Sequence, residues 1–330
     1  MPPSAASHQP SSPKRQKPNV GSALRKPPGP DFDKGIQYWA DVDASVDGVL
    51  GGFGTGPVPH IEQLSSRLLL LSLIPSLHTF PSPLTPLPPP RPSHRLTVLD
   101  VGAGIGRVSR ETLLPLFEDV ILLEPVDKFV REAYRSALDG EWKDLPKRAG
   151  MQVDGATAAA GSSSSKGRGK RVWFVKAGLQ GCDPKHPAQV GESLGVVGEK
   201  NGGEEEEGFG GGAEGEITYD VVWCQWCLGH MNTPELIAFL KKARLALRDT
   251  GATDVEKNAY ESLIFVKENC CEDGPDGKPV EFLDEEDSSL TRSANKWLEI
   301  FKDAGLEVIK EEVQIGMPQE LFVVKTWALR

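Results

Sequence analysis

Three glycines spaced two residues apart, Gly102, Gly104 and Gly106, constrain the fold of this chain more than any other feature. A short apolar run, 96–101, precedes them, and a helix-compatible run, 107–117, follows. The pattern predicts a strand, a tight turn and the start of a helix. Glycine lets backbone N–H groups in such a turn approach a ligand closely, and the helix N-terminus directs its positive dipole toward that ligand. An ordinary loop is the alternative interpretation.

A second apolar run, 120–123, ends in Glu124 and favours a cofactor site at the turn. An acidic residue at the end of the second strand commonly holds the hydroxyls of a nucleotide ribose. The spacing G-x-G-x-G differs from the G-x-G-x-x-G of dinucleotide-binding folds, and it resembles the first motif of class I S-adenosylmethionine-dependent methyltransferases. That cofactor has no pyrophosphate, so the turn would hold its methionine and ribose parts. Arg107 is a candidate partner of the methionine carboxylate, with a solvated helix residue as the alternative.

The composition is that of a globular protein, with 38% hydrophobic and 25% charged residues. The net charge of −10 argues against a broad basic face for nucleic acid and suits a cationic partner. The five cysteines, odd in number and irregular in spacing, indicate reduced intracellular thiols. Residues 1–28 lack the apolar core of a signal peptide, and the longest apolar run, 68–74, is far below the roughly 20 residues that span a bilayer. We therefore expect a cytoplasmic or nuclear monomer without nucleic-acid or membrane partners.

Several stretches have compositions that disfavour packing. Residues 1–34 form a basic tail rich in Pro and Ser, which we expect to be disordered. Its residues 14–17 are a candidate nuclear-import patch, although a solvated tail is the favoured interpretation. We expect one domain over 35–330, interrupted by Pro-rich, Gly/Ser-rich and Gly/Glu-rich insertions at about 75–93, 155–170 and 183–216.

The rest of the chain alternates between strand and helix patterns. We expect strands at 96–101, 120–123, 172–175, 217–226, 262–267, 307–313 and 321–329, and helices at 61–74, 107–117, 127–138 and 292–304. A further helix follows the cap and first-turn signals at 232–234 and has apolar residues at helical spacing over 236–247. This alternation predicts a parallel sheet, to which the last two strands add an antiparallel hairpin.

The pair Cys224 and Cys227 has C-x-x-C spacing. A redox pair of this kind lies at a helix N-terminus, whereas Cys224 lies in a predicted strand. A zinc site needs a second pair of ligands, and the adjacent Cys270 and Cys271 fit a tetrahedral site poorly. We therefore expect no metal.

Taken together, nine stretches resemble the protein α-N-terminal methyltransferases, which act on N-termini beginning X-Pro-Lys. They occur in the order found in that family: 38–39, 46–54, 100–107, 113–117, 178–180, 225–230, 266–269, 287–289 and 328–330. The most specific are Asp-Gly-x-Leu-Gly-Gly at 47–52, Gln-Trp at 225–226 and Asp-Ser-Ser at 287–289. The resemblance implies a class I, Rossmann-like α/β fold. Its seven-stranded, mostly parallel sheet would end in an antiparallel hairpin and carry an N-terminal helical cap.

The resemblance also implies an activity and a set of site residues. The activity is S-adenosyl-L-methionine-dependent methylation of the α-amino group of protein N-termini beginning X-Pro-Lys after Met removal. The implied cofactor residues are Gly102, Gly104, Gly106, Arg107, Glu124, Pro125, Val126, Leu179, Gln180 and Gln225. The implied substrate residues are Trp39, Leu50, Gly51, Trp226, Asn269, Asp284 and Ser289, and the implied catalytic residues are His230 and Asp287. Glu124 and Glu268 stand where the family pattern has aspartates, and Phe322 replaces a tyrosine.

Alternatives remain for the catalytic residues and for the activity. Spacing alone would make His230 a helix-cap residue and Asp287 the N-cap of a following helix. One rival function is that of a class I methyltransferase with another protein or small-molecule substrate. A second is that of an inactive S-adenosylmethionine-binding adaptor.

Overall fold

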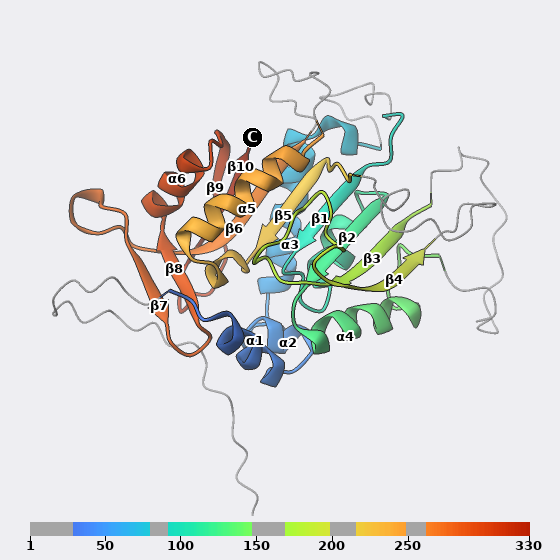
Figure 1. The fold of residues 1–330 in the computed structure, drawn as a ribbon, viewed down its shortest axis with the longest axis horizontal. Helices are drawn as coiled ribbons and strands as arrows, with labels where there is room; N and C mark the ends of the chain where they lie inside the picture. The colour runs from blue at the N-terminus through green and yellow to red at the C-terminus, as the bar shows by residue number, and fades with distance from the viewer. Residues whose placement is uncertain (1–28, 80–91, 147–168, 199–215, 249–261) are drawn as a thin grey trace, which may run out of the picture.

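The structure, a computed structural model, describes residues 29–79, 92–146, 169–198, 216–248 and 262–330 (Figure 1). A mixed sheet of ten strands runs through it, in the order β4-β3-β2-β1-β5-β6-β10-β9, with β8 beside β6 and β7 beside β8. The strands are β1 (Thr97–Val101), β2 (Asp119–Glu124), β3 (Arg171–Lys176), β4 (Glu192–Gly198), β5 (Val221–Gln225), β6 (Leu263–Cys271), β7 (Glu281–Asp284), β8 (Ser289–Ser293), β9 (Val308–Val313) and β10 (Val323–Leu329).

The expected class I sheet is confirmed. Strands β3, β2, β1, β5 and β6 are parallel to one another, and β10 is antiparallel to both β6 and β9. Every residue of β1, β2 and β5 is buried, which explains why these strands are continuous apolar runs in the sequence. Strands β4, β7 and β8 extend the seven expected strands.

Strand β4 corrects the prediction that residues 183–216 have no packing role. It pairs antiparallel with β3, with one register shift, and the Tyr219 hydroxyl donates to the Pro184 carbonyl at 2.7 Å. An edge strand needs backbone pairing on one side only, so Gly-rich and polar residues can form it. Residues 199–215 lie outside the described residues, as does nearly all of the predicted insertion at 155–170.

Helices cover both faces of the sheet. The helices are α1 (Phe32–Asp41), α2 (Val46–Val49), α3 (Val58–Leu73), α4 (Asp127–Leu138), α5 (Thr233–Ala246) and α6 (Ala294–Asp303). One apolar cluster joins α5 and α6 to the sheet, and a second joins α3 and α4 to the opposite face. Helices α1 and α2 lie together beside the start of α4 (Figure 1). None of the helices in the described parts of the chain is long and apolar enough to cross a membrane.

The start of the folded chain and the helix after the glycine turn differ from the prediction. Helix α1 begins at Phe32, with the Asp31 carboxylate accepting from the Lys34 N–H, so the folded chain starts before the tail boundary at 34. The run after the glycine turn contains a π-helical turn, η2 (Ser109–Leu113), in place of a regular helix over 107–117. Residues 1–28, which include the candidate import patch, lie outside the described residues.

Candidate active site

A cavity opens where the ends of β1, β2 and β5 meet α1 and α2. Its empty space is about 1000 Å³, including the part open to solvent. It is lined by Phe32, Gly35, Ile36, Trp39, Val49, Leu50, Asp100, Gly102, Ala103, Gly104, Ile105, Arg107, Val108, Glu124, Pro125, Val126, Phe129, Leu179, Gln180, Gln225, Trp226, Cys227 and His230. Every predicted cofactor residue except Gly106 is in this lining. Parallel strands bring these distant segments to one sheet edge, as the topology predicts.

The three glycines of the turn have different roles. All have positive φ angles, between 58° and 75°. A Cβ on Gly102 would lie 2.3 Å from the Cβ of Cys227, and one on Gly106 would lie 2.7 Å from the Trp142 ring. At Gly104 the nearest atom is 3.9 Å away, on Val49. Gly102 and Gly106 therefore allow the turn to pack, whereas Gly104 leaves room for a ligand.

Glu124 fixes the turn to the end of β2. Its two carboxylate oxygens accept the backbone N–H groups of Gly104 and Val126, each at 2.7 Å. Burial raises the pKa of Glu124 to about 7, against these two hydrogen bonds, which lower it. The side chain lines the cavity, and a carboxylate oxygen that accepts one N–H has a second lone pair for a ligand hydroxyl.

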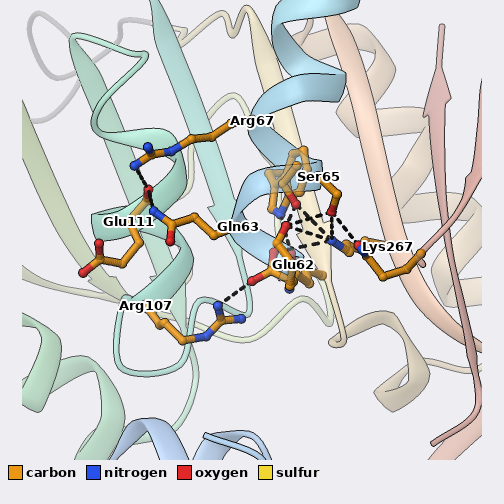
Figure 2. A network of polar contacts seen from close by, with 11 residues as sticks. Glu62, Gln63, Ser65, Arg67, Arg107, Glu111 and Lys267 are labelled. Carbon is orange, nitrogen blue, oxygen red and sulfur yellow. Dashed lines mark hydrogen bonds and ion pairs between the residues drawn. The ribbon is translucent and has the colours of Figure 1, made fainter. Parts of the chain in front are cut away.

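Arg107 is buried and is not the solvated helix residue of the alternative interpretation. Its side chain is 8% exposed, lines the cavity and forms an ion pair from Nη1 to Glu62 Oε2 at 2.5 Å (Figure 2). An arginine fork in this position fits the carboxylate end of a methionine group.

Two amide atoms in the lining have no hydrogen-bond partner among the described residues. They are Oε1 of Gln180 and Nε2 of Gln225, and both are buried. Gln225 is near enough to Glu62 to lower its pKa, but its Nε2 makes no hydrogen bond of normal geometry. A buried polar atom without a partner costs about 1–3 kcal/mol, so these atoms favour a polar ligand in the cavity. With Arg107, Glu124 and the space at Gly104, they fit S-adenosylmethionine.

His230 ends a short 3-10 turn, η3 (Leu228–His230), at the cavity. The Trp39 indole N–H donates to its Nε2 at 3.1 Å, which makes Nε2 an acceptor and the ring neutral. Burial lowers the pKa of His230, against Asp287 and the Ser288 backbone, which raise it. Asn232, and not His230, is the N-cap of α5, so the helix-cap interpretation is wrong.

Asp287 lies in the turn between β7 and β8. Its Oδ1 accepts the Ser289 N–H at 3.0 Å, and burial raises its pKa despite that bond and the nearby His230. A strand follows it, so Asp287 is not the N-cap of a helix. A Cβ on Gly35 would lie 3.3 Å from both the Asp287 carbonyl oxygen and His230 Nδ1. The glycine in α1 therefore lets the His230 ring and the Asp287 backbone both approach the helix closely.

The predicted substrate residues divide into two groups. Trp39, Leu50 and Trp226 line the cavity, and Gly51 follows Leu50 with a φ of 59°. Asp284, Ser289 and Asn269 are outside the lining. Asp284 is exposed and accepts the Glu286 N–H at 2.8 Å. Ser289 is the first residue of β8, and Asn269 lies in β6, where it pairs with Val324 of β10.

Two of the three residues other than glycine that have a positive φ in the described part of the chain lie in or beside this site. Trp226 and Ser288 have φ angles of 54° and 56°, a region that residues other than glycine seldom adopt. Trp226 lines the cavity and Ser288 follows Asp287. Such strain is typical of functional sites.

Helix α1 closes one side of the site, and Trp39 is the one residue of its inner face that the sequence assigned to the site. Phe32, Gly35, Ile36 and Trp39 all line the cavity. The last three follow Phe32 by three, four and seven residues, a spacing that places all four on one face of a helix. This pattern in the sequence could have identified them. The helix is bound to the β7–β8 turn, because the Asp31 N–H donates to Ser288 Oγ at 2.7 Å and Lys34 Nζ donates to the Glu285 carbonyl.

Comparisons with known proteins agree with this geometry. Residues 30–152 and 211–330 match the protein family described as AdoMet dependent proline di-methyltransferase. The alpha N-terminal protein methyltransferase 1 of Arabidopsis thaliana is 30% identical over 300 residues, which cover 90% of this chain and 79% of that protein. The N-terminal Xaa-Pro-Lys N-methyltransferase 1 of Rattus norvegicus is 27% identical over 300 residues, covering 91% of this chain and 95% of that protein.

A solved structure shares the fold. It is a SAM-dependent methyltransferase from Leishmania major, with a TM-score of 0.57 and 25% identity over 91% of this chain and 82% of that one. The family match spans the glycine turn, the ends of β2 and β5, and the β7–β8 turn. The chain therefore belongs to the AdoMet dependent proline di-methyltransferase family and is an S-adenosylmethionine-dependent enzyme of the class I fold.

Proposed function

We propose that this enzyme methylates the α-amino group of protein N-termini that begin Xaa-Pro-Lys. The observation that carries the proposal is an arrangement of three features. The glycine turn and the two tryptophans Trp39 and Trp226 line one cavity, and the acidic turn between β7 and β8 is hydrogen-bonded to α1, which closes that cavity. Relatives whose names state this activity align along about nine tenths of the chain.

The acidic turn faces α1, beside the cavity. Burial raises the pKa of Tyr38 in α1, and Glu286, Asp287 and Asp284 raise it further. A substrate that enters the cavity beside α1 and this turn meets the indoles of Trp39 and Trp226 in the lining and negative charge at the turn. Flat indole surfaces suit a proline ring, and the exposed Asp284 suits the ammonium of a lysine.

The cofactor supplies a methyl group on a sulfonium sulfur, and the substrate amine must present a free lone pair to it. An α-amine with a pKa of about 7.7–8.0 is mostly protonated at neutral pH, so a proton acceptor assists the reaction. We assign this role to Asp287. The lone pair of His230 Nε2 is already used by the Trp39 indole, whereas burial raises the pKa of Asp287 and makes it a stronger base. His230 would then fix Trp39 and the surroundings of Asp287.

The proposed cofactor contacts follow the lining. Arg107 would bind the methionine carboxylate, and Glu124 the ribose hydroxyls. Gln180 and Gln225 would pair their free amide atoms with polar groups of the cofactor, while Val126 and Leu179 supply apolar contacts.

A pair of peptides tests the proposal. One begins Xaa-Pro-Lys with a free α-amine, and its twin carries an N-acetyl group. We expect methyl groups on the free peptide only, located on the N-terminal residue by mass spectrometry. Methylation of the lysine side chain, or equal methylation of both peptides, would overturn the assignment and favour another protein substrate. An enzyme that binds S-adenosylhomocysteine but methylates neither peptide would favour the adaptor.

The cytoplasmic or nuclear location and the monomeric state stay predictions. All five cysteines lie in the described residues and form no disulfide, which is consistent with a reducing compartment.

A further inference from the structure

A buried group of charges lies behind the cavity, between α3, β6 and the segment after the glycine turn (Figure 2). Glu62 of α3 is 0% exposed, Lys267 of β6 is 1% exposed, and Arg107 is 7% exposed. Charged side chains are almost never buried to this degree unless they are paired, so the arrangement requires a specific reason.

The two oxygens of Glu62 serve different partners. Oε2 accepts from Arg107 Nη1 at 2.5 Å, whereas Oε1 accepts from Ser66 Oγ at 3.0 Å and lies 3.5 Å from Lys267 Nζ. Lys267 Nζ in turn donates to Ser66 Oγ at 3.0 Å and to the Glu62 carbonyl at 3.3 Å. Within the described residues the Arg107 guanidinium makes no other hydrogen bond, so its remaining N–H groups are available on the side that lines the cavity.

Helix α3 is fixed against the segment that carries Arg107. Gln63 Nε2 donates to the Glu111 carbonyl at 2.8 Å, and Arg67 Nη2 donates to the same carbonyl (Figure 2). The Glu62 carboxylate is thereby held at a defined place relative to Arg107.

The Glu62 carboxylate is shared between two cations. Burial alone would raise the pKa of Glu62, but Arg107 and Lys267 hold it below its usual value, so Glu62 is ionised. Burial lowers the pKa of Lys267 to about 8, against Glu62 and Glu312, which raise it. On the Arg107 side, Asp100 accepts from Ser109 Oγ at 2.6 Å, and burial raises its pKa to about 7, so it is only partly charged at neutral pH. A carboxylate arriving from the cavity would therefore meet a guanidinium that Glu62 engages through one nitrogen only.

We propose that Glu62 is a positioning residue for the cofactor: it holds Arg107 through Nη1 and leaves the rest of the guanidinium directed at the methionine carboxylate. Lys267 and Ser66 engage the second Glu62 oxygen and so prevent a two-bond Glu62–Arg107 pair that would turn the guanidinium away. The inference rests on the proposed contact between Arg107 and that carboxylate.

Two ligands separate positioning from mere stability. S-adenosylhomocysteine has the carboxylate, whereas 5′-methylthioadenosine keeps the nucleoside and sulfur and lacks the amino acid end. For Glu62→Gln we expect the Kd of S-adenosylhomocysteine to rise about 10-fold, because one charge-assisted contact is weakened. The Kd of 5′-methylthioadenosine should not change. An equal rise for both ligands, or no rise for either, would overturn the proposal. The matched control is Glu111→Gln, the same change at a more exposed side chain paired with Arg110, and it should alter neither Kd.

A double variant covers the risk that Glu62→Gln unfolds the protein by leaving Lys267 buried and unpaired. Glu62→Gln with Lys267→Met removes both charges, so thermal stability without ligand should recover. The weaker binding of S-adenosylhomocysteine, relative to 5′-methylthioadenosine, should persist in the double variant. If this affinity returns to the wild-type value together with the thermal stability, the positioning role is refuted.

The parallel variant Arg107→Lys tests the underlying contact, because lysine keeps the charge but lacks the fork. It should weaken S-adenosylhomocysteine selectively. If it does not, the placement of the carboxylate at Arg107 is wrong. If Arg107→Lys weakens S-adenosylhomocysteine binding selectively and neither Glu62 variant does so, only the role of Glu62 is wrong.

Discussion

Asp287→Asn is the sharpest test of the proposed mechanism, because it removes the base and little else. The amide keeps the size of the side chain and an oxygen that can accept the Ser289 N–H, so the β7–β8 turn should keep its shape. A general base contributes on the order of 10²–10⁴ in rate, and we expect kcat at pH 7 to fall by about 10² or more. Part of this loss has a calculable origin. An α-amine with a pKa near 8 is only about one tenth neutral at pH 7, so roughly 10-fold of the rate should return as the pH rises to 9.

The assay is the initial rate of methylation of an Xaa-Pro-Lys peptide between pH 6.5 and 9.5, followed by mass spectrometry at saturating cofactor. The variant should show a steeper rise with pH than the wild type. S-adenosylhomocysteine binding and thermal stability serve as controls that the fold is intact. If Asp287→Asn keeps the wild-type kcat at pH 7, Asp287 only shapes the turn, and the assignment of the base fails.

Four further outcomes are expected. Asp284→Asn should raise KM for lysine-bearing peptides with little change in kcat, and more strongly at low salt, because Asp284 is exposed and its attraction is screened; a salt-independent effect would argue against it. Gly104→Arg should abolish S-adenosylhomocysteine binding in calorimetry, since the side chain enters the open space at a φ of 58°; unchanged binding would show that the turn does not face the cofactor. Burial raises the pKa of Glu268 from 4.5 to about 7. The folded protein thus holds this proton more tightly than the unfolded chain, so the stabilisation is full below pH 4.5 and is lost as the pH rises to about 7. In urea titrations, the free energy of unfolding of Glu268→Gln should fall by about 2–3 kcal/mol less than that of the wild type over this pH range. The same pH dependence in both proteins would refute the raised pKa. Deleting 183–216 should lower the melting temperature, because β4 and the Tyr219–Pro184 bond are lost, and an unchanged value would show that β4 contributes nothing.

Local patterns in the sequence were sufficient for much of the fold. β1, β2 and β5 are buried on both faces, so each is a continuous apolar run that needs no partner to be recognised. The glycine turn is equally local, because a positive φ is a property of single residues. Strands β4, β7 and β8 escaped prediction because they mix apolar residues with polar ones and, in β4, with glycine, and they form through backbone pairing with neighbouring strands.

Local motifs predicted which residues belong to the site, but they did not predict whether those residues are buried or which residues they pair with. Spacing identified Arg107 as a candidate ligand residue but left open whether it is solvated. Its burial follows from a contact with Glu62, which lies 45 residues earlier in the chain. In the same way, nothing in the strand pattern of β6 reveals that Lys267 pairs with α3.

The arrangement of His230, Asp287 and Gly35 depends entirely on the tertiary structure. The three residues come from η3, the β7–β8 turn and α1, and spacing alone would make His230 and Asp287 helix caps. These residues come together because α1 packs against both η3 and the β7–β8 turn. The neutral state of His230 is set by burial and by the Trp39 indole, 191 residues away in sequence. The sequence by itself therefore determined which residue types are present and which strands form. Only the packing of distant segments decided the burial, the pairing and the protonation of those residues, because these depend on neighbours that the chain brings together only when it folds.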